Sequence, residues 1–222
     1  MSEQTLSVSE MCERFSKIYT GAITDVLDEM GYHHQALPPY LQPLAKGSKL
    51  AGLAFPVFGR PNRRIDYETS LKRILTMLGD APPDSIVIYQ TNDLESAHLG
   101  ELSVTWLKRV GCRGAVIDGG CRDVEYILRE NFPVFCRFTT PVDCCWRWEL
   151  LDYNCPIIIG DVLIHPGDFI VADFDGIVCI PRAIAAEVLL KSEEIVSTEN
   201  LVRKAVRDGM KPLEAYEKFG RF

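Results

Sequence analysis

The stretch Gly114-Ala115-Val116-Ile117-Asp118-Gly119-Gly120-Cys121-Arg122-Asp123 decides the fold that this sequence predicts. Its pattern predicts a short buried strand over Ala115–Ile117 that ends at the glycine pair, and then a helix over 124–129. Two successive glycines at a strand end allow positive φ and let the backbone come close to a ligand. Arg122 and Asp123 then fall at the start of a helix, where free N–H groups and the macrodipole favour an anion.

Arg122 and Asp123 are suited to holding a small oxoacid and a metal ion together. A guanidinium binds a carboxylate through two parallel hydrogen bonds, and a carboxylate is a preferred ligand of hard divalent cations. We therefore predict an active-site corner here. The alternative is a surface ion pair and helix cap of small energetic value, and the neighbouring glycines favour the site.

A second strand and a helix precede this corner. The apolar run 85–90 predicts a strand, and 99–110, ended by Gly111, predicts a helix. Together with Ala115–Ile117 they form a βαβ unit, whose parallel strands end at one edge of the sheet, where ligands bind. We expect the turn Gly100-Glu101-Leu102-Ser103 to face Arg122 and Asp123, with backbone N–H groups as oxyanion donors. A packing role for Gly100 and a helix-start role for Glu101 remain the alternative.

The remaining elements complete an α/β fold. Helices are predicted at both ends of the chain, at Ser9–Tyr19, at Gly21–Met30 with Thr20 as its cap, over 183–208, and from Pro212. A strand is predicted at Leu50–Phe58, and Pro56 within it favours an edge position or a bulge. A helix over 67–78 and a strand over 133–138 are also predicted. Turn residues between short apolar runs predict antiparallel strands at 157–159, 162–164, 169–172 and 177–180.

Composition excludes several functional classes. The chain of 222 residues is 47% hydrophobic and 25% charged, as in ordinary globular proteins. Its net charge of −7 argues against a general nucleic-acid binder, which needs a basic face. The first ten residues are polar, and no apolar run approaches the roughly 18 residues of a membrane span. We expect a cytoplasmic protein with no nucleic-acid or membrane partner.

Cysteine and glycine spacing argue against zinc and nucleotide cofactors. None of the eight cysteines forms a Cys-x-x-Cys pair, and only Cys144 and Cys145 are close, so we expect buried apolar thiols and no zinc. Gly111-x-x-Gly114 precedes a strand, whereas a dinucleotide fingerprint follows one, and the chain has no phosphate-binding Gly-Lys-Ser/Thr run. We expect no nucleotide.

These motifs resemble the RraA-like family. It contains metal-dependent class II pyruvate aldolases acting on 4-hydroxy-4-methyl-2-oxoglutarate and 4-carboxy-4-hydroxy-2-oxoadipate, and the regulators of ribonuclease activity. The resemblance begins at Thr20 and is most specific over 100–102, 111–123 and 166–181. The family has an acidic residue, twenty intervening residues and then Arg-Asp. Here Glu101 stands twenty residues before Arg122-Asp123.

The resemblance implies a three-layer β/β/α swivelling-type single domain over 1–222, with N-terminal helices in 1–31, a core over 50–181 and C-terminal helices over 182–222. It also implies a homotrimer or homohexamer with the site between subunits. Asp123 would hold Mg²⁺ or Mn²⁺, and a glutamate of an adjacent subunit, for which we choose Glu199, would lie near the metal. Arg122 would bind the pyruvyl end of the substrate, whose carboxylate would meet the amides of Glu101, Leu102 and Ser103.

The implied reaction is retro-aldol cleavage of a 4-hydroxy-2-oxo acid to pyruvate, with decarboxylation of oxaloacetate as a second activity. Both pass through a pyruvate enolate that a divalent metal stabilises, and Glu101 would steer the water that serves as acid and base. Aldolases often carry aspartate at the position of Glu101, so the longer side chain here affects which substrate is expected. The substrate class that the resemblance implies is a small 2-oxo dicarboxylic or tricarboxylic acid. The alternative is a non-catalytic regulator that binds a ribonuclease or its partner proteins. Such regulators tend to depart from the Arg-Asp pair, so we favour the enzyme.

Overall fold

The protein, seen in a computed structural model that describes residues 6–222, is built on a nine-stranded mixed sheet. The strands of this sheet are β1 (Gln42–Pro43), β2 (Leu50–Pro61), β3 (Ser85–Gln90), β4 (Ala97–Leu99), β5 (Gly114–Cys121), β6 (Val134–Thr139), β7 (Trp148–Tyr153), β10 (Phe169–Ala172) and β11 (Ile177–Ile180). Their order is β1-β6-β5-β3-β2-β10-β11, with β4 beside β5 and β7 beside β2. Residues 1–5, which begin the predicted N-terminal helical segment 1–31, lie outside the described residues.

The parallel part of the sheet is covered by helices on one face. Strands β2, β3, β5 and β6 are parallel, and α3 (Tyr67–Gly79), α4 (Glu101–Arg109) and α5 (Val124–Arg129) follow β2, β3 and β5 along the chain. Alternate strand residues such as Val87 and Ile117 pack against Met77 and Leu107 of these helices. The other strand residues also lie in a core, which explains the continuous apolar runs.

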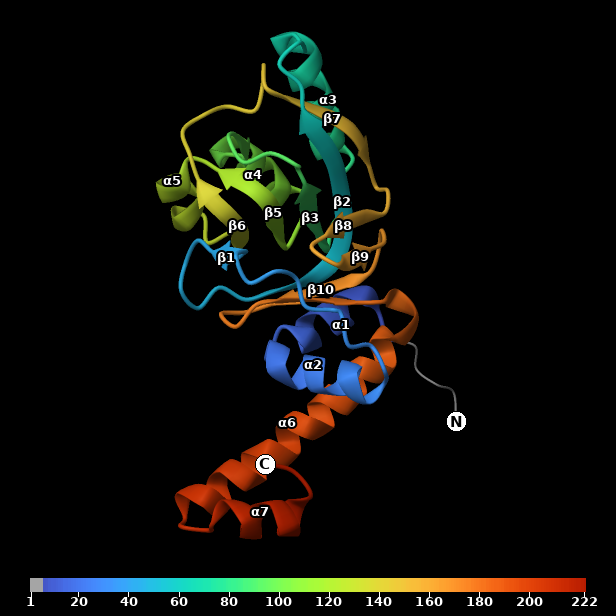
Figure 1. Ribbon diagram of the computed structural model, residues 1–222, viewed down its shortest axis with the longest axis vertical. Helices are drawn as coiled ribbons and strands as arrows, with labels where there is room; N and C mark the ends of the chain where they lie inside the picture. The colour runs from blue at the N-terminus through green and yellow to red at the C-terminus, as the bar shows by residue number, and fades with distance from the viewer. Residues whose placement is uncertain (1–5) are drawn as a thin grey trace.

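The opposite face is covered by strands. The hairpin of β8 (Ile157–Ile159) and β9 (Val162–Ile164) packs with β10 and β11 against residues such as Ile88 and Val116. Beyond β10 and β11 a third cluster joins them to α1 (Val8–Phe15), α2 (Thr20–Glu29) and α6 (Ala185–Arg207). Figure 1 shows α6 leaving the body towards α7 (Pro212–Phe219). The predicted β/β/α fold with a βαβ unit, antiparallel strands and flanking helices is confirmed.

Strand β5 differs from the prediction at its glycine pair. It continues through both glycines to Cys121, and neither has a positive φ. They are needed for space, because a Cβ at Gly119 would lie 2.6 Å from Oγ1 of Thr91, and one at Gly120 would lie 2.5 Å from the carbonyl of Ser96. The chain that follows β3 therefore packs directly on these glycines.

Strand β2 is central and not at an edge, contrary to the expectation for Pro56. It pairs with β3 on one side, and on the other side it pairs with β10 up to Leu53 and with β7 from Val57. Pro56 lies between these two partners, where the missing N–H costs no ladder hydrogen bond. The bulge in β2 falls between Phe58 and Gly59. Strand β7, which the sequence did not predict, provides the second partner.

The start of α2 also corrects a prediction. Thr20 is the first helical residue rather than the cap, and its backbone N–H and hydroxyl donate to the Asp173 carboxylate at 2.8 and 2.7 Å. Asp173 lies in the turn predicted between β10 and β11. A residue about 150 positions away in the chain thus caps this helix.

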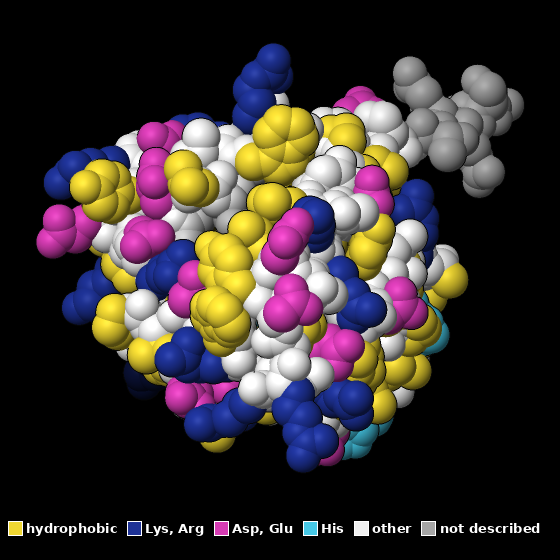
Figure 2. Space-filling model, turned by 90° about the horizontal axis from the view of Figure 1, so that it is seen from above, with side chains coloured by type: hydrophobic (Ala, Val, Ile, Leu, Met, Phe, Trp, Pro, Cys, Tyr) yellow, Lys and Arg dark blue, Asp and Glu magenta, His cyan; other side chains and the backbone are white. Residues whose placement is uncertain are grey.

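The face of the molecule shown in Figure 2 carries charges of both signs. Basic and acidic side chains alternate on it, and hydrophobic side chains gather near its middle. In residues 6–222 no helix combines the length and the apolar character needed to cross a bilayer.

Candidate active site

The start of α4 and the start of α5 meet at one point. The backbone N–H of Glu101 donates to Oδ2 of Asp123 at 3.1 Å, and the N–H of Arg122 donates to the carbonyl of Leu99 at 3.0 Å. The approach is so close that a Cβ at Gly100 would lie 2.6 Å from Oδ2 of Asp123. The structure therefore brings together the two segments that the βαβ argument placed at one sheet edge.

The backbone of Asp123 directs its side chain to this point. Its φ of 58° is left-handed, a conformation uncommon outside glycine, and its side chain makes no capping bond to its own helix α5. The carboxylate instead accepts from the first turn of α4, whose N-cap residue, Gly100, has no side chain. The left-handed residue of the motif is thus Asp123, and left-handed residues of this kind often occur at functional sites.

Arg122 lies between two carboxylates. Its Nε is 3.7 Å from Oδ2 of Asp123, and its Nη1 is 3.3 Å from Oδ2 of Asp143. Sequence reasoning missed Asp143, which follows β6 in an irregular segment without a motif. This segment is held by β4, since the N–H of Ala97 donates to the carbonyl of Val142 at 2.8 Å. Asp143 therefore holds a second nitrogen of the guanidinium, besides the Nε that lies near Asp123.

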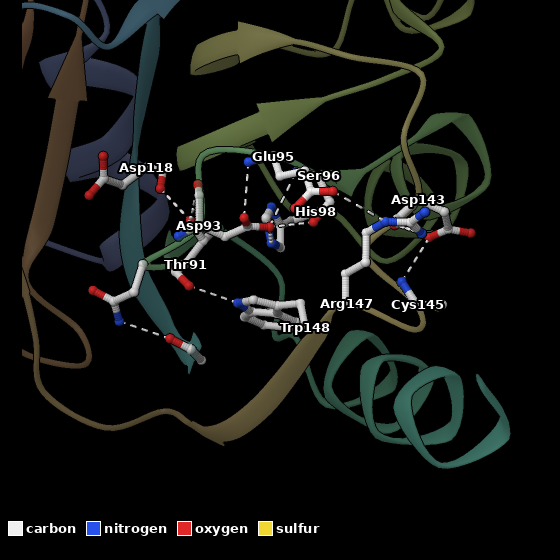
Figure 3. A network of polar contacts seen from close by, with 12 residues as sticks. Thr91, Asp93, Glu95, Ser96, His98, Asp118, Asp143, Cys145, Arg147 and Trp148 are labelled. Carbon is white, nitrogen blue, oxygen red and sulfur yellow. Dashed lines mark hydrogen bonds and ion pairs between the residues drawn. The ribbon is translucent and has the colours of Figure 1, made fainter. Parts of the chain in front are cut away.

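A polar network around the buried Asp93 and His98 precedes the Gly100 turn in the chain (Figure 3). Asp93 accepts from the N–H groups of Glu95 and Ser96 at 2.9 and 3.2 Å, and its Oδ2 lies 3.3 Å from Nε2 of His98. The His98 ring meets the edge of Trp148 at 4.8 Å between centroids. The network lies directly before Gly100 in the chain, so it fixes the position of that turn.

Burial and hydrogen bonding set the charges in this network. Burial lowers the pKa of the His98 imidazole, although Asp93 opposes the shift, so the ring is neutral at pH 7. Burial alone would raise the pKa of Asp93, but the adjacent His98 ring and hydrogen bonds from Ser96 and from the Glu95 N–H lower it. The network therefore carries one fixed negative charge.

Two hollows open on either side of Arg122. One, of about 360 Å³, is lined on this side by the Gly100 turn, Ser103, Arg122 and Asp143. The other, of about 340 Å³, is lined by Cys121 to Val124 and by Thr139, Thr140 and Pro141. Of the three amides predicted to bind the substrate carboxylate, that of Glu101 already donates to Asp123, whereas those of Leu102 and Ser103 belong to the first helical turn and have no acceptor within the helix. Leu102, Ser103 and Arg122 line the same hollow.

Asp123 suits a hard divalent cation. Its side chain is 43% exposed, and among residues 6–222 its Oδ1 has no hydrogen-bond donor. Mg²⁺ is commonly held by one or two carboxylates while it keeps several waters. The Glu101 carboxylate, in the adjoining turn, makes no ion pair within the described part of the chain. Asp123 and Glu101 thus fit a largely hydrated metal.

Glu199 does not join this site within one chain. It lies on α6, at the opposite end of the molecule from α4 and α5 (Figure 1). There its carboxylate accepts from the Tyr19 hydroxyl and lies 3.8 Å from Nη2 of Arg203. Its predicted place near the metal of a neighbouring subunit stays a prediction.

The cysteines are mostly buried thiols, with seven of the eight buried and none in a disulfide. Ligand atoms of Asp143, Cys144 and Cys145 lie within 4.8 Å of one another beside Arg122. This cluster offers three ligands, one fewer than a structural zinc site. A hydrogen bond with Cys145, and burial, raise the pKa of Cys144 and keep that thiol protonated.

Comparisons with known proteins agree on one family. The model of the RraA-like family, described as Aldolase/RraA, matches residues 20–179. A Halalkalibacterium halodurans protein, provisionally named a 4-hydroxy-4-methyl-2-oxoglutarate aldolase, is 30% identical over 203 residues, which are 91% of each chain.

Solved structures show the same fold. A chain described as a novel cellulase from microbes associated with the gut ecosystem is 36% identical, with a TM-score of 0.84 and 90% of each chain covered. Streptomyces coelicolor RraAS2, described as an unusual member of the RNase ES inhibitor RraA protein family, is 26% identical, with a TM-score of 0.77 over 90% of this chain and 98% of that one. The match of the family model to most of the chain shows that this protein belongs to the RraA-like family.

Proposed function

We propose that this protein is a divalent-metal-dependent lyase that cleaves a 4-hydroxy-2-oxo acid by retro-aldol reaction to give pyruvate, and that it also decarboxylates oxaloacetate. The observation that carries the proposal is the contact of the Asp123 carboxylate with the first turn of α4, beside the Arg122 guanidinium. The aldolase names of relatives at about 30% identity support the reaction class.

In the proposed site each residue has one task. Arg122 and the amides of Leu102 and Ser103 bind the carboxylate and 2-oxo oxygen of the pyruvyl part, because they supply the positive charge and donors of the corner. Asp123 would hold Mg²⁺ or Mn²⁺, with Glu101 beside it. The cation, when bound, supplies a Lewis acid for the 2-oxo group.

The same residues suit the charge that develops. When the C3–C4 bond breaks, its electron pair stays on the pyruvyl part as an enolate, and the C4 hydroxyl loses its proton and becomes a carbonyl. Glu101, in the first turn of α4, would exchange that proton with solvent and return one to C3. In oxaloacetate the group that leaves is CO₂, and the enolate is the same. Arg122 favours both reactions because its charge interacts most strongly with the enolate.

We further propose that the protein works as a homotrimer or homohexamer, with the site between subunits and Glu199 reaching the metal region of a neighbour. The support is the location of the site: two open hollows flank Arg122 at the surface of a single chain. The substrate is a small molecule, consistent with the aldolase names of the relatives.

The test is pyruvate release from oxaloacetate and from 4-hydroxy-4-methyl-2-oxoglutarate with Mg²⁺ or Mn²⁺. Asp123→Ala should lose the activity by at least about a hundredfold while its circular dichroism stays unchanged. Glu125→Ala, with an exposed carboxylate on the same helix, should keep full activity. Activity that survives chelation, or an active Asp123→Ala variant, would contradict the proposal.

A second candidate function is regulation of a ribonuclease without catalysis. The likeness to RraAS2, described as belonging to an RNase inhibitor family, favours it. Copurification of a nuclease or its helicase partner, with no effect of divalent metal on thermal stability and no pyruvate release, would put this function first.

A further inference from the structure

The hollow of about 360 Å³ beside Arg122 extends beyond the Gly100 turn into an apolar region. Its outer wall is α3, which presents Tyr67, Leu71 and Leu75, and its floor includes Cys144 and Cys145. On the near side Leu102 stands beside the site with 79% of its surface exposed. The volume falls within the range of small-molecule sites, about 300 to 1,000 Å³. The pyruvyl corner and this apolar region are therefore one continuous cavity.

The cavity has no positive charge to spare for a second carboxylate. Arg122 is the single cation among its described lining residues, and Asp143 and Asp123 lie 3.3 and 3.7 Å from its guanidinium. Two basic residues of α3, Lys72 and Arg73, line a different hollow, and they form ion pairs with Glu68 and Glu149. A carboxylate in the apolar region would lose its hydration and face Asp143 without a partner.

We propose that this region binds the C4 substituent of the substrate and selects an uncharged aliphatic or aromatic group. This inference rests on the proposed function. The reaction would then give pyruvate and an apolar aldehyde: the C3–C4 bond breaks, its electrons pass to the enolate, C3 gains a proton and the C4 hydroxyl loses one. This replaces the expected dicarboxylic or tricarboxylic substrate, and 4-hydroxy-4-methyl-2-oxoglutarate, which carries a carboxylate on C4, should then release pyruvate more slowly than an analogue with an apolar C4 group. Oxaloacetate is a separate case, because its C4 is itself the carboxylate that leaves as CO₂ and carries no substituent to enter the apolar region.

The apolar wall can be tested without turnover. 2-Oxo-4-phenylbutanoate and 2-oxoglutarate share the 2-oxo acid end and lack a 4-hydroxyl, so neither is cleaved, and they differ in carrying a phenyl ring or a carboxylate on C4. Calorimetric titration of the full chain with Mg²⁺ should show the phenyl compound binding at least about tenfold more tightly, as expected for an apolar pocket.

One charge change should reverse this preference. Leu75→Lys places a cation on the exposed part of the wall, since Leu75 is 55% exposed, and it should shift the ratio of the two dissociation constants at least about tenfold towards 2-oxoglutarate. Thr76→Lys adds the same charge to the same helix but faces the other hollow, so it should leave the ratio unchanged.

The outcomes separate this inference from the proposed function. Equal or tighter binding of 2-oxoglutarate by the unmodified protein overturns the apolar selection alone. A changed oligomer mass for Leu75→Lys with an unchanged ratio would show that a second copy, and not the substrate, covers this wall, and it also overturns the inference. If pyruvate, oxaloacetate and both probes fail to bind, the pyruvyl corner itself is wrong and the proposed function fails with it.

Discussion

Asp123 shows how one residue can serve two helices. Its left-handed backbone turns the carboxylate away from α5, which it precedes, and towards the first turn of α4. The cap that α4 lacks at Gly100 is thereby supplied from another segment, and one carboxylate oxygen stays open. Arg122 precedes Asp123 in the same turn and therefore lies beside it. The geometry of the site thus depends on the left-handed backbone of Asp123 and on the absence of a side chain at Gly100.

Gly100 should be sensitive to a single methyl group. Its φ of −139° is open to any residue, so the effect of Gly100→Ala comes from the collision of Cβ with Oδ2 of Asp123. We expect pyruvate release to fall about a hundredfold with the fold retained. Gly79→Ala, where a Cβ meets nothing within 4 Å, should keep activity and gain about 0.5 kcal/mol in urea unfolding. Equal activity of Gly100→Ala and the unmodified protein would contradict the close approach.

Asp143 should act as a positioning residue for Arg122. Asp143→Asn removes the charge 3.3 Å from Nη1, so we expect kcat/KM for oxaloacetate to fall about tenfold. Most of this loss should be in KM. Asp143→Glu should restore part of the loss, whereas Asp161→Asn, at the exposed turn between β8 and β9, should change nothing. A loss in kcat alone would argue against a role in substrate binding.

Acid should destabilise the protein through His98 and Asp93. The folded state lowers the pKa of both groups, so the unfolded chain binds more protons as the pH falls. The free energy of unfolding should therefore decrease below about pH 6.5 through His98, and further below about pH 4 through Asp93. Urea unfolding of His98→Gln should show a smaller decrease between pH 7 and 5, whereas the exposed control His34→Gln should match the unmodified protein.

At the scale of elements, α2 depends on a turn between two distant strands. Asp173 is 8% exposed and accepts both the N–H and the hydroxyl of Thr20, so it joins α2 to the β10–β11 turn. The N-terminal helices, α6 and these strands share one apolar cluster, so a loosened α2 should weaken this end of the molecule.

Asp173→Ala should therefore lower the free energy of unfolding by about 1 to 2 kcal/mol, because it removes a buried cap. Chemical denaturation measures this directly. Asp175→Ala, in the same turn but exposed, should stay within about 0.5 kcal/mol of the unmodified protein. Similar effects of the two substitutions would mean that the turn, and not the cap, is what matters.

At the scale of the whole molecule, the two residues proposed to share one site lie far apart within a single chain. Glu199 is on α6, at the opposite end of the molecule from α4 and α5, where Asp123 lies (Figure 1). If Glu199 serves the site of a neighbour, Asp123→Ala and Glu199→Ala should each lose activity alone. Mixed subunits should regain part of it, because some sites then carry both residues. Mixtures as inactive as the parent variants would remove Glu199 from the site.

The sequence by itself determined the elements whose signals are local. Apolar runs bounded by turn residues set β3 and the four short strands from β8 to β11 at the predicted positions, and the motif that ends at Arg122 and Asp123 set the start of α5. The right-handed, parallel geometry of a βαβ unit was enough to place the Gly100 turn opposite Arg122 and Asp123, since both segments follow neighbouring strands.

Only the tertiary structure decided the features that depend on contacts distant in the chain. The approach of Asp143 to Arg122, the capping of Thr20 by Asp173 and the pairing of β7 with β2 leave no local pattern, because each partner is an ordinary residue until folding brings the two together. The central position of Pro56 follows from the same cause: a strand may contain proline where its neighbour changes, and only the assembled sheet shows where that is.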